Sequence, residues 1–241
     1  MTELCDMHCH ILPGVDDGAK TMEEALHVMR EASRQQIGEM IVTPHFHPGR
    51  YRVYAEQVYD SVMELRRQCQ LAGIDVMLYP GQECYYFTGM AEALDRREIL
   101  TLAGSRYVLT EFSPDCPYSY LRNGLRELQI HGYHPILAHF ERYSCLREKE
   151  HLFQVKEQGI LLQMNFDTLL QREFFFHKNP WRQMVKEGLV DYLGSDCHGM
   201  DFRPLHVYEA YQWVLRNVDT EIRNRMFVQN INKIIKRAKD R

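Results

Sequence analysis

The sequence predicts an α/β fold in which seven parallel strands alternate with helices around one core. Three observations support this. Short β-rich runs alternate with amphipathic stretches along the 241 residues, hairpin signals are missing between them, and no repeat or Pro/Gly/Ser-rich linker divides the chain. Seven βα units in single file fit a closed barrel with one unit fewer than the common eight, and an open doubly wound sheet is the alternative. We expect a single domain over residues 1–241.

Seven short runs rich in apolar and β-branched residues are expected to form the strands. Met40–Thr43, with the sequence Met-Ile-Val-Thr, is typical of a short buried strand. The predicted strands are residues 4–7, 40–43, 75–79, 106–110, 135–138, 160–164 and 192–194.

The stretches between these strands carry helix start and stop signals. Thr21 caps the first helix, and Glu24, three residues later, completes a capping box. Gly73 and Gly132 follow the ends of two helices, and Pro180 occupies a first helical position. The predicted helices are residues 21–36, 53–71, 90–97, 118–130, 148–158 and 180–187, with two further segments after residue 205.

The composition excludes several classes of protein. Twenty-nine basic and thirty-three acidic residues leave a net charge of −4, so no bulk field attracts nucleic acid or an anionic membrane. No window approaches the roughly 20 apolar residues that cross a bilayer, and the N-terminus lacks a signal-peptide pattern. Seven irregularly spaced cysteines fit reduced thiols. We expect a cytoplasmic protein with no nucleic-acid partner and no membrane insertion.

Side chains that bind metals gather where the predicted strands end. Six of the seven strands run into a His, Asp or Glu. In parallel α/β folds the ligand-binding face lies beyond the carboxyl ends of the strands, so these distant residues are expected to converge on one rim. With an aspartate from the loop after the first strand, the candidate metal ligands are His8, His10, Asp17, His45, Glu83, Glu111, His139, Asp196 and His198.

The number of these ligands indicates more than one ion. Nine nitrogen and oxygen ligands exceed the roughly four that zinc takes or the roughly six that manganese takes. Two or three divalent ions bridged by carboxylates fit better, with Glu83 and Asp196 as the natural bridges. Three such ions would outweigh the four carboxylates by about two positive charges, which suits a phosphate dianion.

The motifs around these residues resemble those of the PHP (polymerase and histidinol phosphatase) superfamily. They are the N-terminal His-x-His, Thr-Pro-His after the second strand, a separate Glu and His after later strands, and a late Asp-x-His. Over about residues 4–210 the segments DMHCHILPGVDDGA, TPHFHPG, PGQE, TEFS, AHFER and SDCH resemble bacterial tyrosine-protein phosphatases of capsule and exopolysaccharide loci. The resemblance implies a distorted (β/α)7 barrel with a trinuclear centre, usually of Mn2+, with Fe, Zn or Mg as alternatives.

The resemblance also implies a role for each candidate residue. It assigns the ligands to three ions. The first is held by His8, His10, Glu83 and Asp196, the second by Glu83, Glu111 and His139, and the third by Asp17, His45 and His198. Arg142, three residues after His139, matches the phosphate-contacting arginine of that family. Arg203 is the candidate for the second such arginine.

The implied activity is hydrolysis of phosphotyrosine on a protein by a metal-activated hydroxide that attacks the phosphoryl group. The implied partner is a bacterial tyrosine kinase that regulates capsular or exopolysaccharide synthesis. Two alternatives stay open: a small-molecule phosphatase such as a histidinol-phosphate phosphatase, and a non-catalytic metal-binding regulatory domain.

Three further segments were weighed for function. Cys116 and Cys197 each begin a Cys-x5-Arg segment, but neither loop has the glycines that cradle a phosphate, so we reject a thiol phosphatase. Tyr51, flanked by two arginines just beyond His45, is a candidate for contact with a peptide substrate. Phe174–Phe176 are interpreted as a packing or lid segment.

Overall fold

Two sheets form the centre of the molecule in the computed structural model, which describes residues 4–171 and 179–239. One sheet has the order β1–β2–β5, and the other has the order β10–β9–β8–β7–β6–β3–β4. Among the described strands every neighbouring pair is parallel except β3–β4. The strands are β1 (Leu4–Cys9), β2 (Ile37–Val42), β3 (His45–His47), β4 (Tyr51–Arg52), β5 (Met77–Pro80), β6 (Glu83–Tyr85), β7 (Tyr107–Glu111), β8 (His134–Leu137), β9 (Leu161–Asn165) and β10 (Tyr192–Gly194). Phe174–Phe176 lie outside the described residues.

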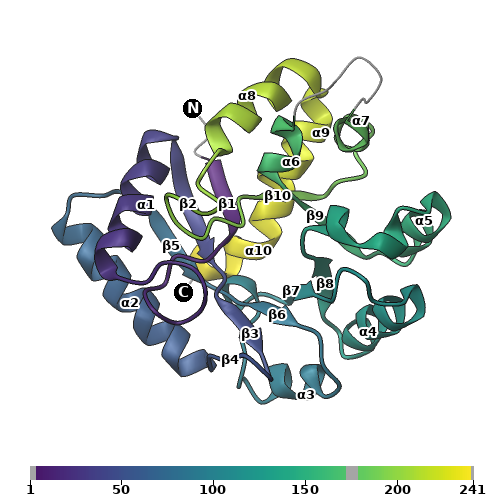
Figure 1. Cartoon of the computed structure of the whole chain (residues 1–241), viewed down its shortest axis with the longest axis horizontal. Coiled ribbons are helices and arrows are strands. Elements are labelled where there is room, and N and C mark those ends of the chain that lie inside the picture. The colour runs from purple at the N-terminus through teal and green to yellow at the C-terminus, as the bar shows by residue number, and fades with distance from the viewer. Residues whose placement is uncertain (1–3, 172–178, 240–241) are drawn as a thin grey trace.

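Main-chain hydrogen bonds join the two sheets at the carboxyl ends of their strands. The amide of Asp196, just after β10, donates to the carbonyl of His8 on β1 at 2.8 Å, and the amide of His10 donates to the carbonyl of Cys197 at 2.8 Å. On the other side, the chain passes from β2 to β3 and from β5 to β6 through only two residues each. The two sheets are therefore joined at this end of the molecule, with helices on the outside (Figure 1), and the predicted parallel α/β class is confirmed.

The predicted helices are present with small shifts at their ends. The Thr21 side chain accepts a hydrogen bond from the amide of Glu24 at 3.2 Å, so Thr21 caps the helix as predicted. The Glu24 carboxylate accepts from the amide of Lys20, one residue before the cap, instead of from the Thr21 amide that a capping box uses. Asn179 caps the helix that begins at Pro180. These outer helices are α1 (Met22–Arg34), α2 (Ala55–Leu71), α3 (Met90–Asp95), α4 (Tyr118–Ile130), α5 (Lys149–Glu157), α6 (Phe166–Leu170) and α7 (Pro180–Lys186).

The expectation that the chain has no hairpin is wrong. Pro44 interrupts the second strand, the chain resumes as β3, and it turns back through Pro48-Gly49-Arg50 into β4. The amide of Arg50 closes the turn by donating to the carbonyl of His47 at 3.0 Å. Strands of two or three residues are too short to show a period-two pattern, so this hairpin, β6 and the short helix α6 were missed.

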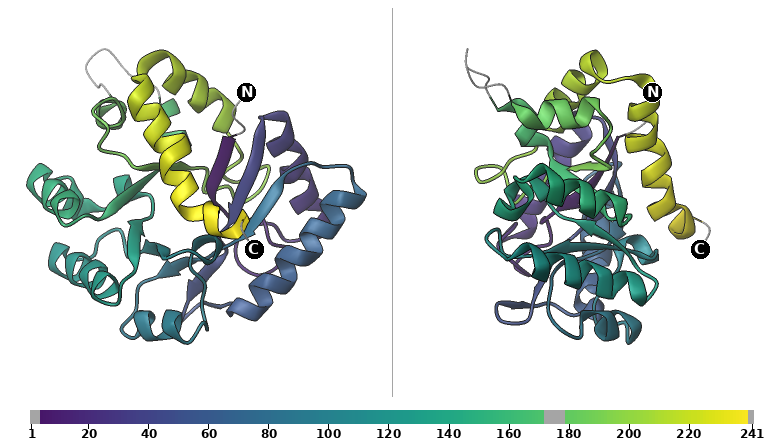
Figure 2. Two further views of the ribbon diagram at one scale, coloured as in Figure 1. Left: turned by 180° about the vertical axis from the view of Figure 1, so that it is seen from behind. Right: turned by 90° about the vertical axis from the view of Figure 1, so that its right-hand side faces the viewer.

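Three C-terminal helices complete the described fold, and the last of them packs across the strands on the side away from the metal-binding side chains (Figure 2). They are α8 (Val207–Asn217), α9 (Thr220–Asn224) and α10 (Asn230–Lys239), with a π-helical turn at Arg225–Gln229. Ile231, Ile234 and Ile235 of α10 are buried in an apolar cluster with strand residues such as Met7 and Leu109. Figure 2 shows α10 in yellow crossing the strands when the molecule is seen from behind. No helix within the described residues is both long and apolar enough to span a membrane.

Candidate metal centre

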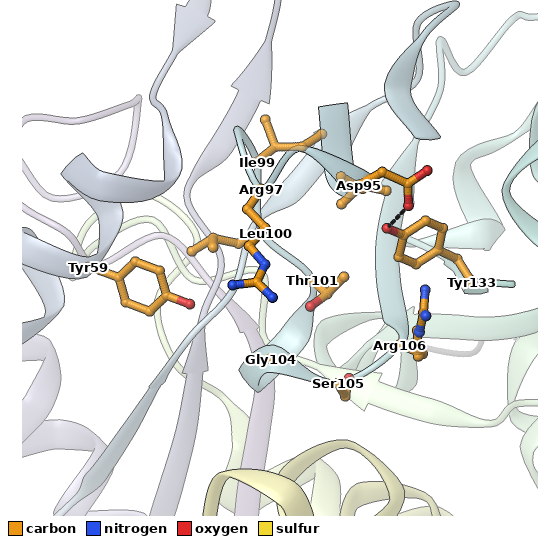
Figure 3. Close-up of a pocket in the computed structure, with 11 residues that line it drawn as sticks. Tyr59, Asp95, Arg97, Ile99, Leu100, Thr101, Gly104, Ser105, Arg106 and Tyr133 are labelled. Atoms are coloured by element: carbon orange, nitrogen blue, oxygen red, sulfur yellow. Dashed lines mark hydrogen bonds between the residues drawn. The ribbon is translucent and has the colours of Figure 1, made fainter. Parts of the chain in front are cut away.

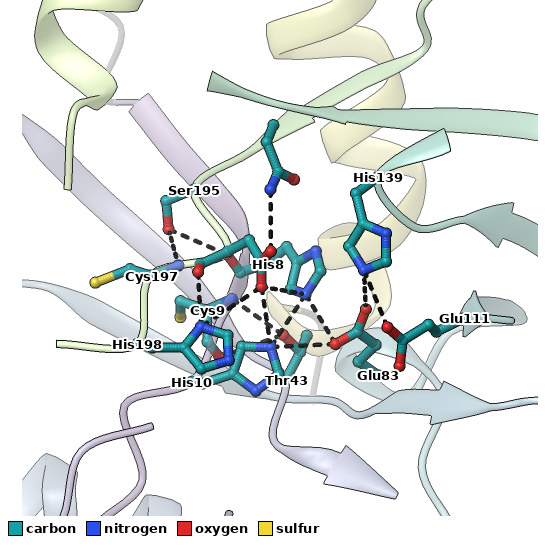
Figure 4. A network of polar contacts seen from close by, with 12 residues as sticks. His8, Cys9, His10, Thr43, Glu83, Glu111, His139, Ser195, Cys197 and His198 are labelled. Atoms are coloured by element: carbon teal, nitrogen blue, oxygen red, sulfur yellow. Dashed lines mark hydrogen bonds and ion pairs between the residues drawn. The ribbon is translucent and has the colours of Figure 1, made fainter. Parts of the chain in front are cut away.

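The nine predicted ligands converge at the carboxyl ends of the strands, as Figure 4 shows for most of them. They come from β1 and its following loop, from the ends of β7, β8 and β10, and from the points where the chain leaves β2 and β5 and resumes as β3 and β6. The candidates form three groups, and within each group one potential ligand atom per residue lies within 4.8 Å of the others. The groups are His8, His10, Glu83 and Asp196; His10, Asp17, His45 and His198; and His45, Glu83 and Glu111. The convergence expected from a parallel α/β fold is therefore present in the structure.

Glu83 is the centre of this cluster. Its Oε2 lies 3.2 Å from Nε2 of His8, 3.2 Å from Nε2 of His10 and 3.1 Å from Nδ1 of His45, yet it has no hydrogen-bond partner. Its Oε1 lies 2.8 Å from Nε2 of His139. Glu83 is fully buried, so this carboxylate faces four imidazole rings out of contact with bulk solvent.

Asp196 joins the cluster to the two predicted phosphate-binding arginines. Its Oδ1 lies 3.5 Å from Nε2 of both His8 and His10. Its Oδ2 accepts hydrogen bonds from Arg142 at 2.5 Å and from Arg203 at 3.3 Å. The structure therefore brings both arginines to the edge of the cluster.

Asp17 lies at the outer edge of the cluster and is half-buried. Its Oδ1 is 3.4 Å from Nε2 of His45 and 3.6 Å from Nε2 of His198. These are the three residues that the family resemblance assigned to one ion. The structure places His10 beside them.

Several residues that orient the ligands were not predicted. Asp16 Oδ2 lies 2.8 Å from Nδ1 of His10, and Gln163 Oε1 lies 3.0 Å from Nδ1 of His8. Such contacts fix the ring orientation and leave the other nitrogen facing the site. Asn165 donates to Asp196 at 3.0 Å. Asp16 could have been suspected from its place beside Asp17, but no pattern distinguishes Gln163 from other strand residues.

Burial and mutual repulsion shift the pKa values of the cluster. Burial and the neighbouring Glu83 raise the pKa of Glu111 to about 9, and burial with His10 lowers the pKa of His45 to about 4. Burial opposes the ionisation of Asp196, but His8 and His139 hold its pKa below the ordinary range. A bound divalent cation would favour carboxylate and neutral imidazole together, which is the ligand form of every member.

The residues present fit a group of divalent ions. Three buried atoms of the candidate ligands lack hydrogen-bond partners, namely Asp17 Oδ1, Glu83 Oε2 and His139 Nδ1. The first two sit among imidazole nitrogens at distances of 3.1 to 3.6 Å. Buried polar atoms without partners destabilise a fold, and a bound cation would supply the missing partner. Mixed imidazole and carboxylate donors suit zinc, iron or manganese.

Chelation of the bound ions is expected to lower thermal stability. An ion present at about a hundred times its Kd adds about 2.7 kcal/mol to the free energy of unfolding. Each kcal/mol moves the Tm of a chain of this size by roughly 2–4 °C. We therefore expect EDTA to lower the Tm of Mn2+-loaded protein by roughly 5–10 °C in differential scanning calorimetry. Excess Mn2+ should restore it, and equal Tm values with and without EDTA would contradict a metal centre.

The cavity above the cluster is the candidate active site. It has a volume of about 280 Å³ and is lined by candidate ligands together with Arg142 and Arg203. A larger cavity of about 480 Å³ lies at the amino ends of β7 and β8 (Figure 3). The one carboxylate in its lining, Asp95, accepts a hydrogen bond from Tyr133 at 2.8 Å, so this second cavity lacks a metal-binding set.

The cysteines are not placed for nucleophilic catalysis. Cys116 and Cys197 are buried, and burial raises the pKa of both thiols to about 12. A thiol with so high a pKa is not a nucleophile at neutral pH. The rejection of a thiol phosphatase is consistent with this geometry.

The fold and the site together define a parallel α/β protein with a candidate metal-binding cluster of His, Asp and Glu side chains at one end of its strands. Comparison with known proteins refines this class. The family profile described as "Capsular polysaccharide synthesis, CpsB/CapC" matches residues 4–236, so the chain belongs to the CpsB/CapC family. The predicted resemblance to phosphatases of capsule loci is thereby confirmed.

Relatives and solved structures agree with this assignment. The tyrosine-protein phosphatase CpsB of Streptococcus pneumoniae is 31% identical over 238 residues, 96% of this chain and 98% of that protein. YwqE of Bacillus subtilis, also named a tyrosine-protein phosphatase, is 30% identical over 220 residues, 91% of this chain and 87% of that protein.

A crystal structure from a study of YwqE and CpsB, described as unique metal-dependent tyrosine phosphatases, superposes with a TM-score of 0.86 at 29% identity. It covers 97% of this chain and 94% of the matched chain. The phosphotriesterase homology protein of Escherichia coli has a TM-score of 0.61 at 12% identity, covering 97% of this chain and 99% of that chain, which shows a shared fold only.

Proposed function

We propose that this chain is a metal-dependent protein-tyrosine phosphatase of a capsule or exopolysaccharide locus. The observation that supports this most is the largely buried cluster of five imidazoles and four carboxylates with two arginines at its edge. Membership of the CpsB/CapC family and the names of its relatives point to the same activity. The proposed partner is the phosphotyrosine-bearing tail of a bacterial tyrosine kinase.

The proposal extends to the metal, the architecture and the compartment. Mn2+ is the proposed metal, with His8, His10, Glu83 and Asp196 holding one ion and the other predicted sets holding two more. The strands are proposed to form a distorted (β/α)7 barrel in one domain over residues 1–241. A cytoplasmic location is supported by seven cysteines that are all free thiols, six of them buried.

When bound, the ions supply Lewis-acid stabilisation of the phosphoryl oxygens and lower the pKa of water. The protein's own residues orient everything else. Asp16 and Gln163 accept from the Nδ1 atoms of His10 and His8, which fixes each Nε2 toward the site. Arg142 and Arg203 present guanidinium donors at the cavity wall, where they bind the equatorial oxygens of the phosphoryl group.

The chemistry of the leaving group agrees with this site. A phenol has a pKa near 10, whereas an aliphatic alcohol is a far poorer leaving group. The residues that line the cavity include no carboxylic acid outside the predicted ligand set, as judged over the described part of the chain. Tyrosine phosphate is the protein phosphomonoester that least needs such an acid.

A substrate panel tests the proposed function. Mn2+-loaded protein is expected to hydrolyse a phosphotyrosyl peptide with a kcat/KM at least about tenfold above that for histidinol phosphate, because the latter releases an alkoxide. Phosphate release is the measurement. Preference for histidinol phosphate would support the small-molecule alternative, and no turnover of any aryl phosphate would support a regulatory metal-binding domain.

A further inference from the structure

The cavity above the metal cluster has two chemically different sides. Arg142 and Arg203 follow β8 and β10, whereas His47, Tyr51 and Tyr85 lie on β3, β4 and β6 and line the same cavity. In the sheet order β10–β9–β8–β7–β6–β3–β4, the arginines belong to one half and the aromatic residues to the other. We call His47, Tyr51 and Tyr85 the aromatic wall.

Neighbouring groups hold the rings of the aromatic wall in place. The ring of Tyr51 lies 5.7 Å from that of His45 at an interplanar angle of 9°, and the guanidinium of Arg50 lies 4.8 Å from its centroid. The rings of His47 and Tyr85 are 4.4 Å apart, and His47 Nδ1 accepts from the amide of Gly49 at 3.0 Å. Side chains that are ordered before binding lose little entropy when a ligand packs on them.

The missed β3–β4 hairpin is what creates this wall. Period-two alternation along β3 directs Phe46 into the core and leaves His45 and His47 on the cavity side. The same alternation along β6 buries Cys84 and leaves Tyr85 half-buried at the cavity. All three rings of the wall therefore keep part of their surface for a ligand.

We propose that the aromatic wall is the subsite for the phenyl ring of the substrate and sets a preference for aryl over alkyl phosphates. This inference rests on the proposed function, since it places the phosphoryl group between the cluster and the arginines. Aromatic rings prefer offset or edge-to-face contacts with centroids about 4.5–7 Å apart, and such pairs add affinity beyond area burial. A phosphoserine side chain has no ring to make these contacts.

Two phosphonates of different size isolate the contribution of the ring. Phenylphosphonate carries the ring and methylphosphonate does not, and the carbon–phosphorus bond of each resists hydrolysis. Isothermal titration calorimetry of Mn2+-loaded protein gives the Kd of each ligand. The Kd of methylphosphonate divided by that of phenylphosphonate reports the aromatic contacts without any need for turnover. We expect Tyr51→Ala and Tyr85→Ala each to reduce this ratio about fivefold while the Kd of methylphosphonate stays within about twofold.

Matched variants control for folding and for ring chemistry. Tyr51→Phe keeps the ring and should keep the ratio. Tyr85→Leu keeps apolar volume without a ring, so the ratio should fall in part. Tyr54→Ala removes a ring from the same segment of chain. The Tyr54 side chain is 48% exposed, its ring lies 5.8 Å from that of Phe46, and it does not line the cavity. It should leave the ratio unchanged.

Two results would overturn the inference. One is an unchanged ratio in Tyr51→Ala and Tyr85→Ala, and the other is an equal loss of affinity for both phosphonates, which would assign these residues to metal or phosphate positioning. The proposed function fails separately, if wild-type protein hydrolyses no phosphotyrosyl peptide. In that case the phosphonate ratio still reports whether the wall binds a ring.

Discussion

Glu83→Gln is expected to remove most of the bound metal and to lower kcat toward a phosphotyrosyl peptide by roughly a thousandfold, equivalent to about 4 kcal/mol. The reason is the central position of this carboxylate, whose two oxygens lie within 3.2 Å of nitrogens from His8, His10, His45 and His139. An amide has nearly the same shape but no charge. It also presents an N–H group to ring nitrogens that face the metal.

Metal content by inductively coupled plasma mass spectrometry and turnover should fall together in this variant. Glu64→Gln is the matched control, because Glu64 is an exposed carboxylate on α2 paired with Arg67 at 2.8 Å. It should keep full metal content and activity, since exposed ion pairs contribute little. Normal metal content in Glu83→Gln would show that Glu83 is not a ligand.

The neutral amide should also change the stability of the protein without metal. The carboxylate of Glu83 is fully buried, and burial opposes its ionisation, but the surrounding imidazoles hold its pKa well below the ordinary value. Replacing it removes the partner that compensates those rings. We therefore expect the variant to have a lower Tm than the wild type in EDTA, and to lose most of the EDTA-dependent shift in Tm as well.

The convergence of the candidate ligands could be predicted from the sequence because it follows from topology. Parallel strands place their carboxyl ends on one rim, so each His, Asp or Glu at a strand end, such as His45 or His139, was recognisable without coordinates. The strand-end rule depends only on locating strands to within a few residues. Errors of two residues in strand length left the nine residues unchanged.

The rest of the site depends on interactions that leave no local pattern. Gln163 contacts His8 across 155 positions of sequence and is one of two polar residues in β9. The hairpin that carries Tyr51 consists of strands too short for any periodicity. Pro48-Gly49 is a turn signal, but on its own it predicts a bend and not the pairing of Phe46 with Arg52.

Arg142→Ala is expected to lower kcat by roughly a hundred- to a thousandfold while leaving metal content near normal. Arg142 follows His139 on a short 3-10 turn and donates to Asp196 Oδ2, so its guanidinium lies at the cavity wall without being a ligand. Removing one preorganised donor from a developing oxyanion costs about that factor in other enzymes. The ions stay because every candidate ligand remains.

Arg142→Lys separates charge from geometry. Lysine keeps the positive charge but not the planar fork that binds two phosphoryl oxygens, so we expect it to recover only part of the lost kcat. Arg122→Ala is the matched control, because Arg122 is exposed on α4 with its guanidinium 5.8 Å from the ring of Tyr118, away from the cavity. Steady-state kinetics with metal analysis measure all three variants. Arg142→Ala with normal metal and unchanged kcat would mean that phosphoryl binding relies on the ions and Arg203 alone, because the second arginine already lies 3.3 Å from the same Asp196 oxygen.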